Sequence, residues 1–295
     1  MSQPDNFGFS EEAALLKSSA RKFFSDNFPT DRLHALVADD PTPERMPGCH
    51  WDRELWQQMV DLGWSMLAVP EAAGGIGMPA VAVAGLVEEL GRAAFPCPLI
   101  TTLNASYVLA ACGEAGFDAL GEIAQGRSAT LAITGARGSW NPSSCDVRLE
   151  QGKLQGMAHY VQDARKSDRF LVSARSGDQL VLCWVNSDAA GVEILPDAII
   201  DLTRDQARVR FADVPVEPLG ADAAAALEAA FPAIWTVLAA DMVGAAEWQL
   251  QTTVEYVSAR QQFDRQLGFF QAVKHPLVDA MVMIDQTKSL VYLSL

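Results

Sequence analysis

Positive charge is scarce in this 295-residue sequence, which has 22 lysines and arginines against 37 aspartates and glutamates and a formal net charge of −15. Such an acidic chain has little non-specific attraction to nucleic acid or to an anionic membrane. It can still bind a phosphate-rich cofactor, but local arginines or helix N-termini must then supply the attraction. The charge balance therefore excludes a general nucleic-acid-binding role and makes the few basic residues informative.

Cysteine and histidine are also sparse. The five cysteines are scattered and include no C-x-x-C pair, a pattern typical of reduced intracellular thiols. His34, His50, His159 and His275 never approach one another at metal-ligand spacing. We therefore predict free thiols and no metal site.

Leader-like and membrane-spanning patterns are lacking as well. The N-terminus has no basic region followed by an apolar run. The most apolar long stretch, residues 223–243, is interrupted by Glu228, Pro232 and Asp241. These features predict a soluble, cytoplasmic protein.

The first 125 residues have helical periodicity. Ser10 is a suitable N-cap for a first helix that ends near Asn27, because Glu11 and Glu12 in its first turn favour the helix dipole. Gly91 is the expected end of another helix. Helices are predicted at residues 11–27, 52–62, 79–90, 102–111 and 117–124.

The pattern changes near Gly126 and again after Pro218. Between them, short β-branched or alternating segments favour an antiparallel sandwich or barrel, with strands at 129–134, 146–150, 169–174, 180–185, 192–195 and 207–211. Residues 221–260 then read as one long helix with a kink or break at Pro232, and 269–295 as another. The fold class is α+β in segregated blocks: an N-terminal helical domain (1–125), a middle β-domain (126–218) and a C-terminal helical domain (219–295). Because residue 295 lies in an apolar helical pattern, we expect a bundle that continues in a longer chain.

Three groups of segments, in order along the chain, resemble the acyl-CoA dehydrogenase family. The first lies in the N-terminal helices, the second at the end of the β-domain, and the third where the two long helices meet. In sequence order they are Leu55–Trp64, Val69–Gly77 and Glu88–Arg92; Asp201–Arg204 and Val209–Pro215; and Tyr256–Phe263, Phe270–Gln271 and Asp279–Met281.

The resemblance implies a helical domain, a β-domain and a C-terminal four-helix bundle. It also implies α,β-dehydrogenation of an acyl-CoA thioester, in which a carboxylate takes the α-proton and FAD takes the β-hydride. The protein then positions the flavin, which carries out the redox chemistry. Electron-transfer flavoprotein is the electron acceptor that the family implies.

The resemblance assigns Arg260 to the FAD pyrophosphate of a neighbouring subunit, a task that suits a permanently charged group with two parallel donors. It places Phe263 and Gln271 beside the adenosine part of the same FAD. The alternative for Arg260 is a solvated cation at a helix C-terminus. Asp264 stands where the family usually has glycine, so we expect the geometry of this turn to differ from that in the family.

The β-domain departs from the family pattern. Thr134 matches a flavin-lining position, but Gly135 replaces the glutamate that follows it in the family. Tyr160 stands in place of a flavin-stacking tryptophan, and Gln162 in place of a threonine at the flavin edge. Tyr160 either stacks on a flavin or packs as an ordinary sheet residue.

No catalytic base is evident. Most family members carry a glutamate late in the C-terminal bundle, and a minority carry it at the position of Ile234, which cannot accept a proton. Asp241 lies two helical turns further along, in an apolar surrounding that favours a raised pKa, and is a weak candidate; a capped or interface carboxylate is the other interpretation.

A chain with these departures resembles one subunit of a heteromeric acyl-CoA dehydrogenase, in which two unlike subunits share each flavin. Such complexes often act on CoA esters of bulky acids, including steroid fragments. Two alternatives remain open: a homotetramer whose base lies in a further C-terminal segment, and a non-catalytic binding homologue.

Overall fold

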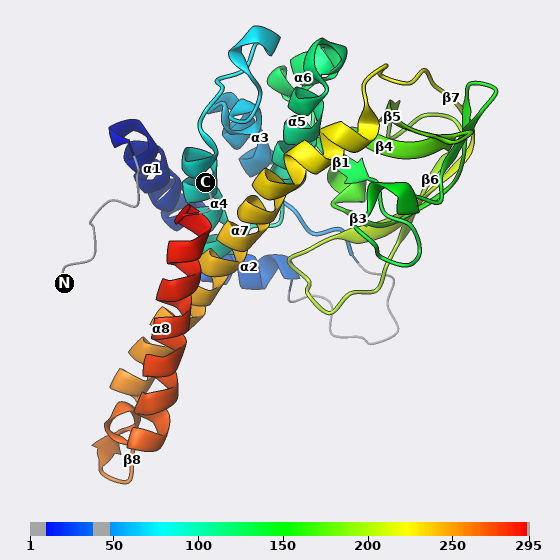
Figure 1. Cartoon of the computed structure of the whole chain (residues 1–295). Coiled ribbons are helices and arrows are strands. Elements are labelled where there is room, and N and C mark those ends of the chain that lie inside the picture. Colours follow the sequence, from blue (N-terminus) through cyan, green and yellow to red (C-terminus); the bar gives the residue numbers. More distant parts are fainter. Residues whose placement is uncertain (1–9, 38–47, 294–295) are drawn as a thin grey trace. The chain divides into compact units, whose positions relative to one another are not determined.

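A computed structural model describes residues 10–37 and 48–293, and its helices, strands and long helices follow one another in the predicted order (Figure 1). By compactness the chain forms two units. Unit 1 comprises Met1–Leu33, Pro79–Phe95 and Trp235–Leu295, and unit 2 comprises His34–Met78 and Pro96–Ile234. The division into three successive domains stays a prediction.

The first helix forms as its sequence predicts. Helix α1 (Glu11–Asn27) begins after Ser10, whose hydroxyl oxygen accepts a hydrogen bond of 3.1 Å from the backbone N–H of Ala13. Its buried residues, among them Ala20 and Phe24, pack toward α4 (Ala80–Ala93). Helix α2 (Thr30–Val37) follows directly and was not predicted.

Gly91 does not end its helix, contrary to the prediction. Helix α4 continues to Ala93, and a Cβ atom at Gly91 would lie 2.1 Å from the backbone oxygen of Asp241 in the following long helix α7 (Ala223–Ala259). A Cβ at Gly244 of α7 would lie 1.8 Å from the backbone oxygen of Glu88. The two glycines therefore allow the backbones of α4 and α7 to touch.

Helix α7 is continuous through Pro232, as the single-helix prediction required. Among the described residues it is also the helix whose length and composition would suffice to cross a membrane, but half of its most apolar stretch is buried within the protein. Burial of this kind is usual for a core helix of a soluble protein.

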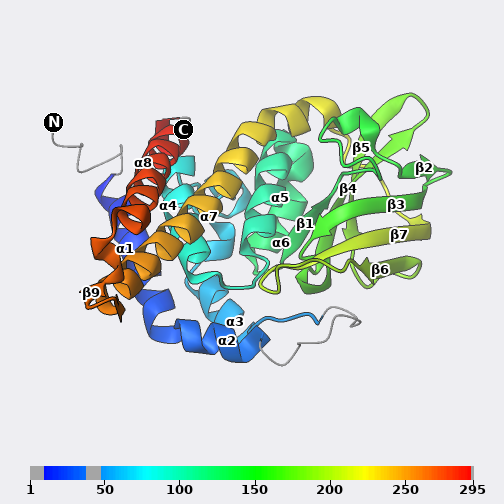
Figure 2. The ribbon, with the colours of Figure 1, turned by 90° about the horizontal axis from the view of Figure 1, so that it is seen from below.

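Helix α8 (Gln271–Leu293) lies beside α7 in Figures 1 and 2, and Lys288 of α8 donates a 2.6 Å hydrogen bond to Glu247 of α7. Residues 294 and 295 of the predicted last helix lie outside the described residues.

Unit 2 combines short helices with a sheet. The helices are α3 (Arg53–Asp61), α5 (Leu99–Ala111) and α6 (Phe117–Ala124), with 3-10 turns at Trp64–Met66, Glu71–Ala73, Gly113–Gly116, Pro142–Ser144 and Ala164–Lys166. The strands are β1 (Ala129–Ala132), β2 (Arg148–Glu150), β3 (Lys153–Gln162), β4 (Arg169–Ser176), β5 (Gln179–Asn186), β6 (Val192–Pro196) and β7 (Gln206–Pro215). Alternate side chains of β7, including Val209 and Phe211, enter the buried core beneath the sheet.

The prediction of a wholly antiparallel sheet is wrong in one respect. Most neighbours, such as β3–β7 and β6–β7 (Figure 2), are antiparallel, but β1 and β2 each pair with β4 in parallel. The chain between β1 and β4 is long enough for the crossover that a parallel pair needs.

Strand β3 was not predicted, because its alternation of apolar and polar residues is broken. Its register against β7 shifts between Leu154 and Gln155 and again between Ala158 and Val161. At Gly156 the backbone has φ +123°, and a Cβ there would lie 2.5 Å from the backbone oxygen of Asp146. Two β-bulges in one strand remove the period-two signal that marks a strand in a sequence.

Candidate functional site

The connection between α7 and α8 holds three predicted cofactor-binding residues. After α7 the chain forms a hairpin of β8 (Gln261–Gln262) and β9 (Arg265–Gln266), then a 3-10 turn at Leu267–Phe269, before α8 begins. The N–H of Leu267 donates a 2.9 Å hydrogen bond to the carbonyl of Arg260 and closes the hairpin onto the end of α7. Arg260 precedes the hairpin, Phe263 lies at its turn, and Gln271 is the first residue of α8.

The side chain of Arg260 is exposed, and its guanidinium makes no hydrogen bond or ion pair with any described residue. The segment 258–275 carries Arg260, Arg265 and Lys274 against a single acidic residue, Asp264, in a chain whose net charge is −15. An unpaired guanidinium in a locally basic segment next to a helix N-terminus is suited to a phosphate group.

Phe263 and Asp264 are the two central residues of the hairpin turn, with φ of 54° and 61°. Two positive φ angles define a type I′ turn, in which glycine or asparagine is usual and a phenylalanine is strained. The ring of Phe263 is 84% exposed and meets Phe270 edge-on, at 6.1 Å between centroids. A strained turn thus carries an exposed aromatic ring, and strained backbone of this kind often occurs at ligand sites.

Replacing Asp264 with glycine should stabilise the protein by a few tenths of a kcal/mol up to about 1 kcal/mol, because glycine has no steric penalty at positive φ. The hairpin between β2 and β3 provides the reciprocal control. There Gln151 and Gly152 occupy the same turn positions with φ of 51° and 74°, so Gly152→Asp should destabilise by a similar amount. Denaturant unfolding checks both variants, and a loss of stability in Asp264→Gly would contradict the argument.

Unit 2 contains a second group of predicted residues, around a cavity of about 320 Å³. Thr134, Tyr160 and Gln162, which the sequence placed on two separate segments, all line it. The complete lining is Thr101, Asn104, Thr130, Leu131, Ile133, Thr134, Gly138, Trp140, Tyr160, Gln162 and Gln206.

Tyr160 lies at the second bulge of β3, with φ +57°. The bulge turns its ring out of the sheet, so that the residue is 47% exposed and is not packed in the interior. Its hydroxyl donates a 3.2 Å hydrogen bond to the carbonyl of Ala136. The ring is thus fixed between β3 and the loop that follows β1.

Two backbone N–H groups of that loop have hydrogen-bond partners within the protein. The N–H of Ala136 donates to a carboxylate oxygen of Asp146 at 2.7 Å, and the N–H of Gly138 donates to the carbonyl of Gly135 at 2.9 Å. A Cβ at Gly135 would lie 2.3 Å from the backbone oxygen of Ser144. The glutamate that the family has at this position would therefore not fit here.

Asn104 of α5 is a site residue that the sequence reading missed. Polar residues recur on this otherwise apolar helix. The hydroxyl groups of three of them donate hydrogen bonds to backbone carbonyls of the preceding turn: Thr101, Thr102 and Ser106. Asn104 is 4% exposed, and its side-chain oxygen has no hydrogen-bond partner. A buried amide inside an apolar helix is the signal that could have identified it.

Carboxylates and histidines are absent from the described lining of this cavity. Asp241 lies in α7 within unit 1 and lines neither this cavity nor the one described next; its backbone oxygen packs against Gly91. Ile234, at the alternative base position, is fully buried. Within the described chain, the cavity therefore offers no general base.

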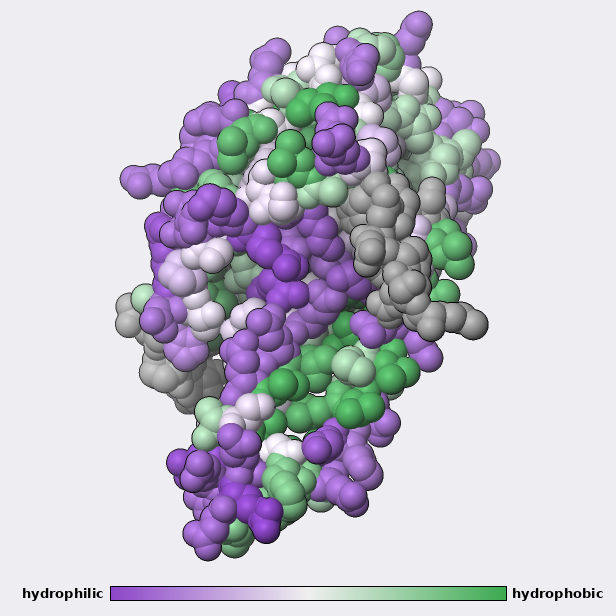
Figure 3. Space-filling view, turned by 90° about the vertical axis from the view of Figure 1, so that its left-hand side faces the viewer, coloured by the Kyte–Doolittle hydropathy of each residue, from purple (hydrophilic) through white to green (hydrophobic). Residues whose placement is uncertain are grey.

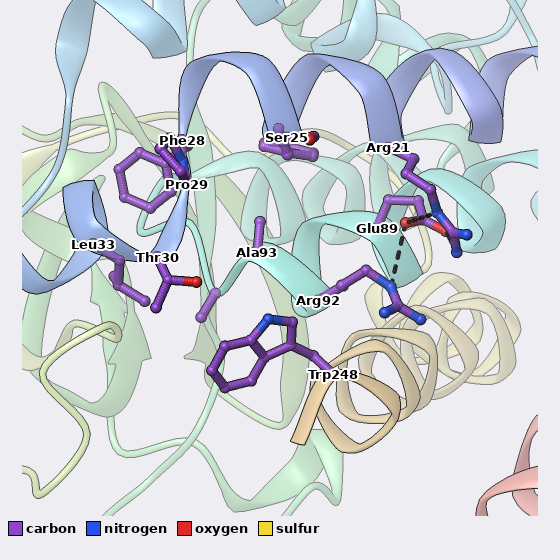
Figure 4. Close-up of a pocket in the computed structure, with 12 residues that line it drawn as sticks. Arg21, Ser25, Phe28, Pro29, Thr30, Leu33, Glu89, Arg92, Ala93 and Trp248 are labelled. Atoms are coloured by element: carbon purple, nitrogen blue, oxygen red, sulfur yellow. Dashed lines mark hydrogen bonds and ion pairs between the residues drawn. The ribbon is translucent and has the colours of Figure 1, made fainter. Parts of the chain in front are cut away.

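Unit 1 has a cavity of about 340 Å³ between α1, α4 and α7, lined by Phe24, Phe28 and Trp248 at its apolar side (Figure 4). At its polar end, Arg21 donates two hydrogen bonds of 2.9 Å to Glu89, and Arg92 donates a 2.7 Å hydrogen bond to Glu247. The charges at this cavity are thus already paired within the chain.

Next to it, Glu88 is 1% exposed and lies between two lysines, with Nζ of Lys17 at 2.7 Å and Nζ of Lys288 at 2.8 Å. Burial raises the pKa of Glu88, but the two lysines outweigh it and hold the pKa below the ordinary value. Glu88 therefore stays charged and joins α1, α4 and α8.

Comparison with known proteins agrees with this architecture. The family "Acyl-CoA dehydrogenase, N-terminal domain" matches residues 10–120, and "Acyl-CoA dehydrogenase, C-terminal domain" matches residues 224–294. Acyl-CoA dehydrogenase IpdE2 of Mycobacterium tuberculosis (strain ATCC 25618 / H37Rv) is 34% identical over 282 residues, which cover 95% of this chain and 74% of the relative.

Solved structures show the same fold. A variant of the Tcur3481-Tcur3483 steroid ACAD has a TM-score of 0.81 at 30% identity, covering 96% of this chain and 77% of its own. The ChsE4-ChsE5 complex from Mycobacterium tuberculosis has a TM-score of 0.80 at 24% identity, covering 95% and 75%. The chain belongs to the acyl-CoA dehydrogenase family, whose members are FAD-dependent oxidoreductases, and the predicted fold class, cofactor and enzyme class are confirmed.

Proposed function

We propose that this chain is one subunit of a heteromeric acyl-CoA dehydrogenase, and that its α7–α8 connection completes the FAD site of a second, related subunit. The observation that supports this most strongly is Arg260, exposed and without a partner beside an exposed Phe263. Arg260 would hold the pyrophosphate, while Phe263 and Gln271 would contact the adenosine part. When bound, FAD supplies the acceptor for the substrate's β-hydride.

The loop after β1 argues against a tightly held flavin in this chain's own β-domain. Asp146 already takes the N–H of Ala136, and Gly135 has no room for a side chain. The cavity of about 320 Å³ is at the small end of ligand sites, which range from about 300 to 1,000 Å³ and bury most of a drug-sized ligand. Thr134, Tyr160 and Gln162 therefore remain weak candidates for flavin contacts.

Because no carboxylate or histidine lines the described cavity, we propose that the second subunit carries out the proton transfer. That subunit would supply the carboxylate that removes the α-proton. Asp241, whose backbone packs between helices, is better explained as a carboxylate of the helix interface than as the base.

Unit 1 offers a surface for such a subunit. Apolar side chains gather in the lower part of the face in Figure 3, where α7 and α8 lie. Large apolar residues on these helices that are more than 40% exposed include Met242, Val254, Val278, Met281, Val282, Met283 and Leu290. A helix pair with so much apolar surface is typical of an interface between subunits.

For the substrate, we infer the CoA ester of a bulky acid. The Tcur3481-Tcur3483 protein, similar over 96% of this chain, is described as a steroid ACAD, which favours a steroid-derived acyl group. The electrons would pass to an electron-transfer flavoprotein, as the family implies, and we expect the complex to work in the cytoplasm.

Purified by itself, the chain should be nearly colourless, because Gly135, Tyr160 and Gln162 replace the residues that the family has at its flavin-facing positions. Co-expressed with an acyl-CoA dehydrogenase-like subunit of the same genome, it should co-purify as a yellow complex. The measurement is visible absorbance per chain after gel filtration, with the second subunit alone as a control. A yellow protein holding one FAD per chain without any partner would overturn the heteromeric proposal and favour a homotetramer. A colourless complex would favour a non-catalytic homologue.

A further inference from the structure

Unit 1 contains a cavity that the proposed function does not use. It is the space of about 340 Å³ between α1, α4 and α7, and every residue of its lining belongs to unit 1 (Figure 4). None of the residues assigned to the flavin lines it. A ligand of this cavity would therefore be distinct from the flavin.

Aromatic rings form the walls of this cavity. Phe24 and Phe28 are each 3% exposed, and both rings pack against the buried ring of Phe95, with centroid distances of 6.0 and 4.6 Å. Trp248 of α7 lies on the other side of the space (Figure 4). Because Phe95 holds two of the rings in place, the cavity does not depend on a ligand for its shape.

Small side chains keep the space between these rings open. Helix α4 ends there at Ala93, and Figure 4 shows the methyl group of Ala93 between Ser25 and Trp248. Ala94, which follows, has φ 48°, and strained backbone of this kind often occurs at ligand sites. A larger side chain at position 93 would fill the cavity.

The accessible charge at the polar end of the cavity is positive. The side chain of Glu89 is 0% exposed, and both of its oxygens accept hydrogen bonds from Arg21. The side chain of Arg21 is 55% exposed, and Glu89 occupies only two of the five N–H donors of its guanidinium. A ligand would thus meet the remaining donors of Arg21 and would not meet the carboxylate.

Trp248 supplies a further donor. Its indole N–H has no acceptor among the described residues, and it is not one of the unpaired polar atoms that the protein encloses. Figure 4 shows its nitrogen on the edge of the ring that faces Ala93. An indole N–H can only donate, so it favours a ligand atom that accepts.

We propose that this cavity binds a small aromatic carboxylate, with its ring between Phe28 and Trp248 and its carboxylate on Arg21. Aromatic rings form stacked or edge-on contacts with one another, which favours a ring over an alkyl chain. A carboxylate only accepts hydrogen bonds, and it suits the donors of a guanidinium. A cationic ligand is disfavoured, because the exposed charge at this end is that of Arg21. The volume suits a ligand of about two rings.

The first test compares 2-naphthoate with 2-naphthamide, its uncharged counterpart of similar shape, by isothermal titration calorimetry on the purified chain. Naphthoate should bind roughly 5-fold more tightly, as expected for a partly exposed ion pair, and added salt should reduce the difference. No binding of naphthoate, or equal binding of the two probes, would overturn the inference.

Two variants test the location of the site. Ala93→Leu should abolish naphthoate binding, because leucine fills the space and is well tolerated in a helix. Trp248→Phe should weaken it by roughly 5-fold, because a ring remains but the N–H donor is lost. The matched control is Trp140→Phe, which should bind naphthoate as the wild type does, since Trp140 lines the cavity of unit 2.

Thermal unfolding provides a second readout, because a ligand that binds only the folded chain raises the midpoint. Naphthoate should raise the midpoint of the wild type and of Trp140→Phe, but not that of Ala93→Leu. Binding that survives in Ala93→Leu, or that is unchanged in Trp248→Phe, would refute the location. If Ala93→Leu did not fold, Trp248→Phe and the comparison of the two probes would still decide. Since none of these measurements involves flavin, their failure would leave the proposed function untouched.

Discussion

Replacing Arg260 with alanine should lower the affinity of the assembled complex for FAD by roughly 10- to 100-fold, because a hydrogen bond to a charged group contributes about 1.5–3 kcal/mol. The fold of this chain should be unaffected, since the guanidinium makes no interaction with the described residues. Arg260→Lys should restore only part of the affinity, because an ammonium group lacks the planar pair of donors. The measurement is FAD per complex after gel filtration in the presence of the partner subunit.

Arg265→Ala is the matched control, because it removes the same charge from the same hairpin. The guanidinium of Arg265 lies 4.3 Å from the ring centroid of Phe269 and is therefore already engaged within the chain. The Arg265→Ala variant should therefore reduce the flavin content of the complex much less than Arg260→Ala does. Equal flavin content in Arg260→Ala and the wild type would refute the assignment of Arg260, which would then be an ordinary cation at the end of a helix.

A methyl group at position 244 should destabilise the protein by about 3 kcal/mol, at the upper end of the range for overpacked interiors. The Cβ of Gly244→Ala would lie 1.8 Å from the backbone oxygen of Glu88 and 2.9 Å from the backbone nitrogen of Arg92. Since both neighbours are backbone atoms of α4, no side chain can move aside, and the two helices must separate. Chemical denaturation of the purified variant measures the effect.

Gly121→Ala provides the comparison for this experiment. Gly121 lies inside α6, and a Cβ there meets nothing within 4 Å. Alanine is favoured over glycine in a helix by about 0.5–1 kcal/mol, so this variant should be slightly more stable than the wild type. If Gly244→Ala were as stable as Gly121→Ala, the close contact between α4 and α7 would be wrong.

Local signals were sufficient for most of the secondary structure. Ser10 identifies the start of α1 because capping depends on residues three positions away, and α6 was predicted at its observed bounds, 117–124. The same local signals failed where a distant contact decides the backbone. Gly91 resembles a helix end but serves a helix–helix contact, and the bulges of β3 hide its alternation.

Sequence reasoning likewise identified some features of the candidate site and missed others. Arg260, Phe263 and Gln271 lie within twelve residues, so the resemblance of that one segment was enough to select them. The strain at Phe263 was not predicted. A type I′ turn is usually recognised in a sequence by a glycine, and here Asp264 occupies the position of that glycine. In the proposed function, these residues contact a flavin only when a second chain is bound.

The sequence alone thus determined what depends on neighbouring residues: the order of helices and strands, the family, and the basic segment around Arg260. Only the tertiary structure brought Thr134 and Gln162 to one cavity, paired β1 with β4 in parallel, and left the side-chain oxygen of Asn104 without a hydrogen-bond partner. The reason is physical, since periodicity and capping act over a few residues. Strand register, helix contacts and the pairing of buried polar groups depend on segments that are far apart in the chain.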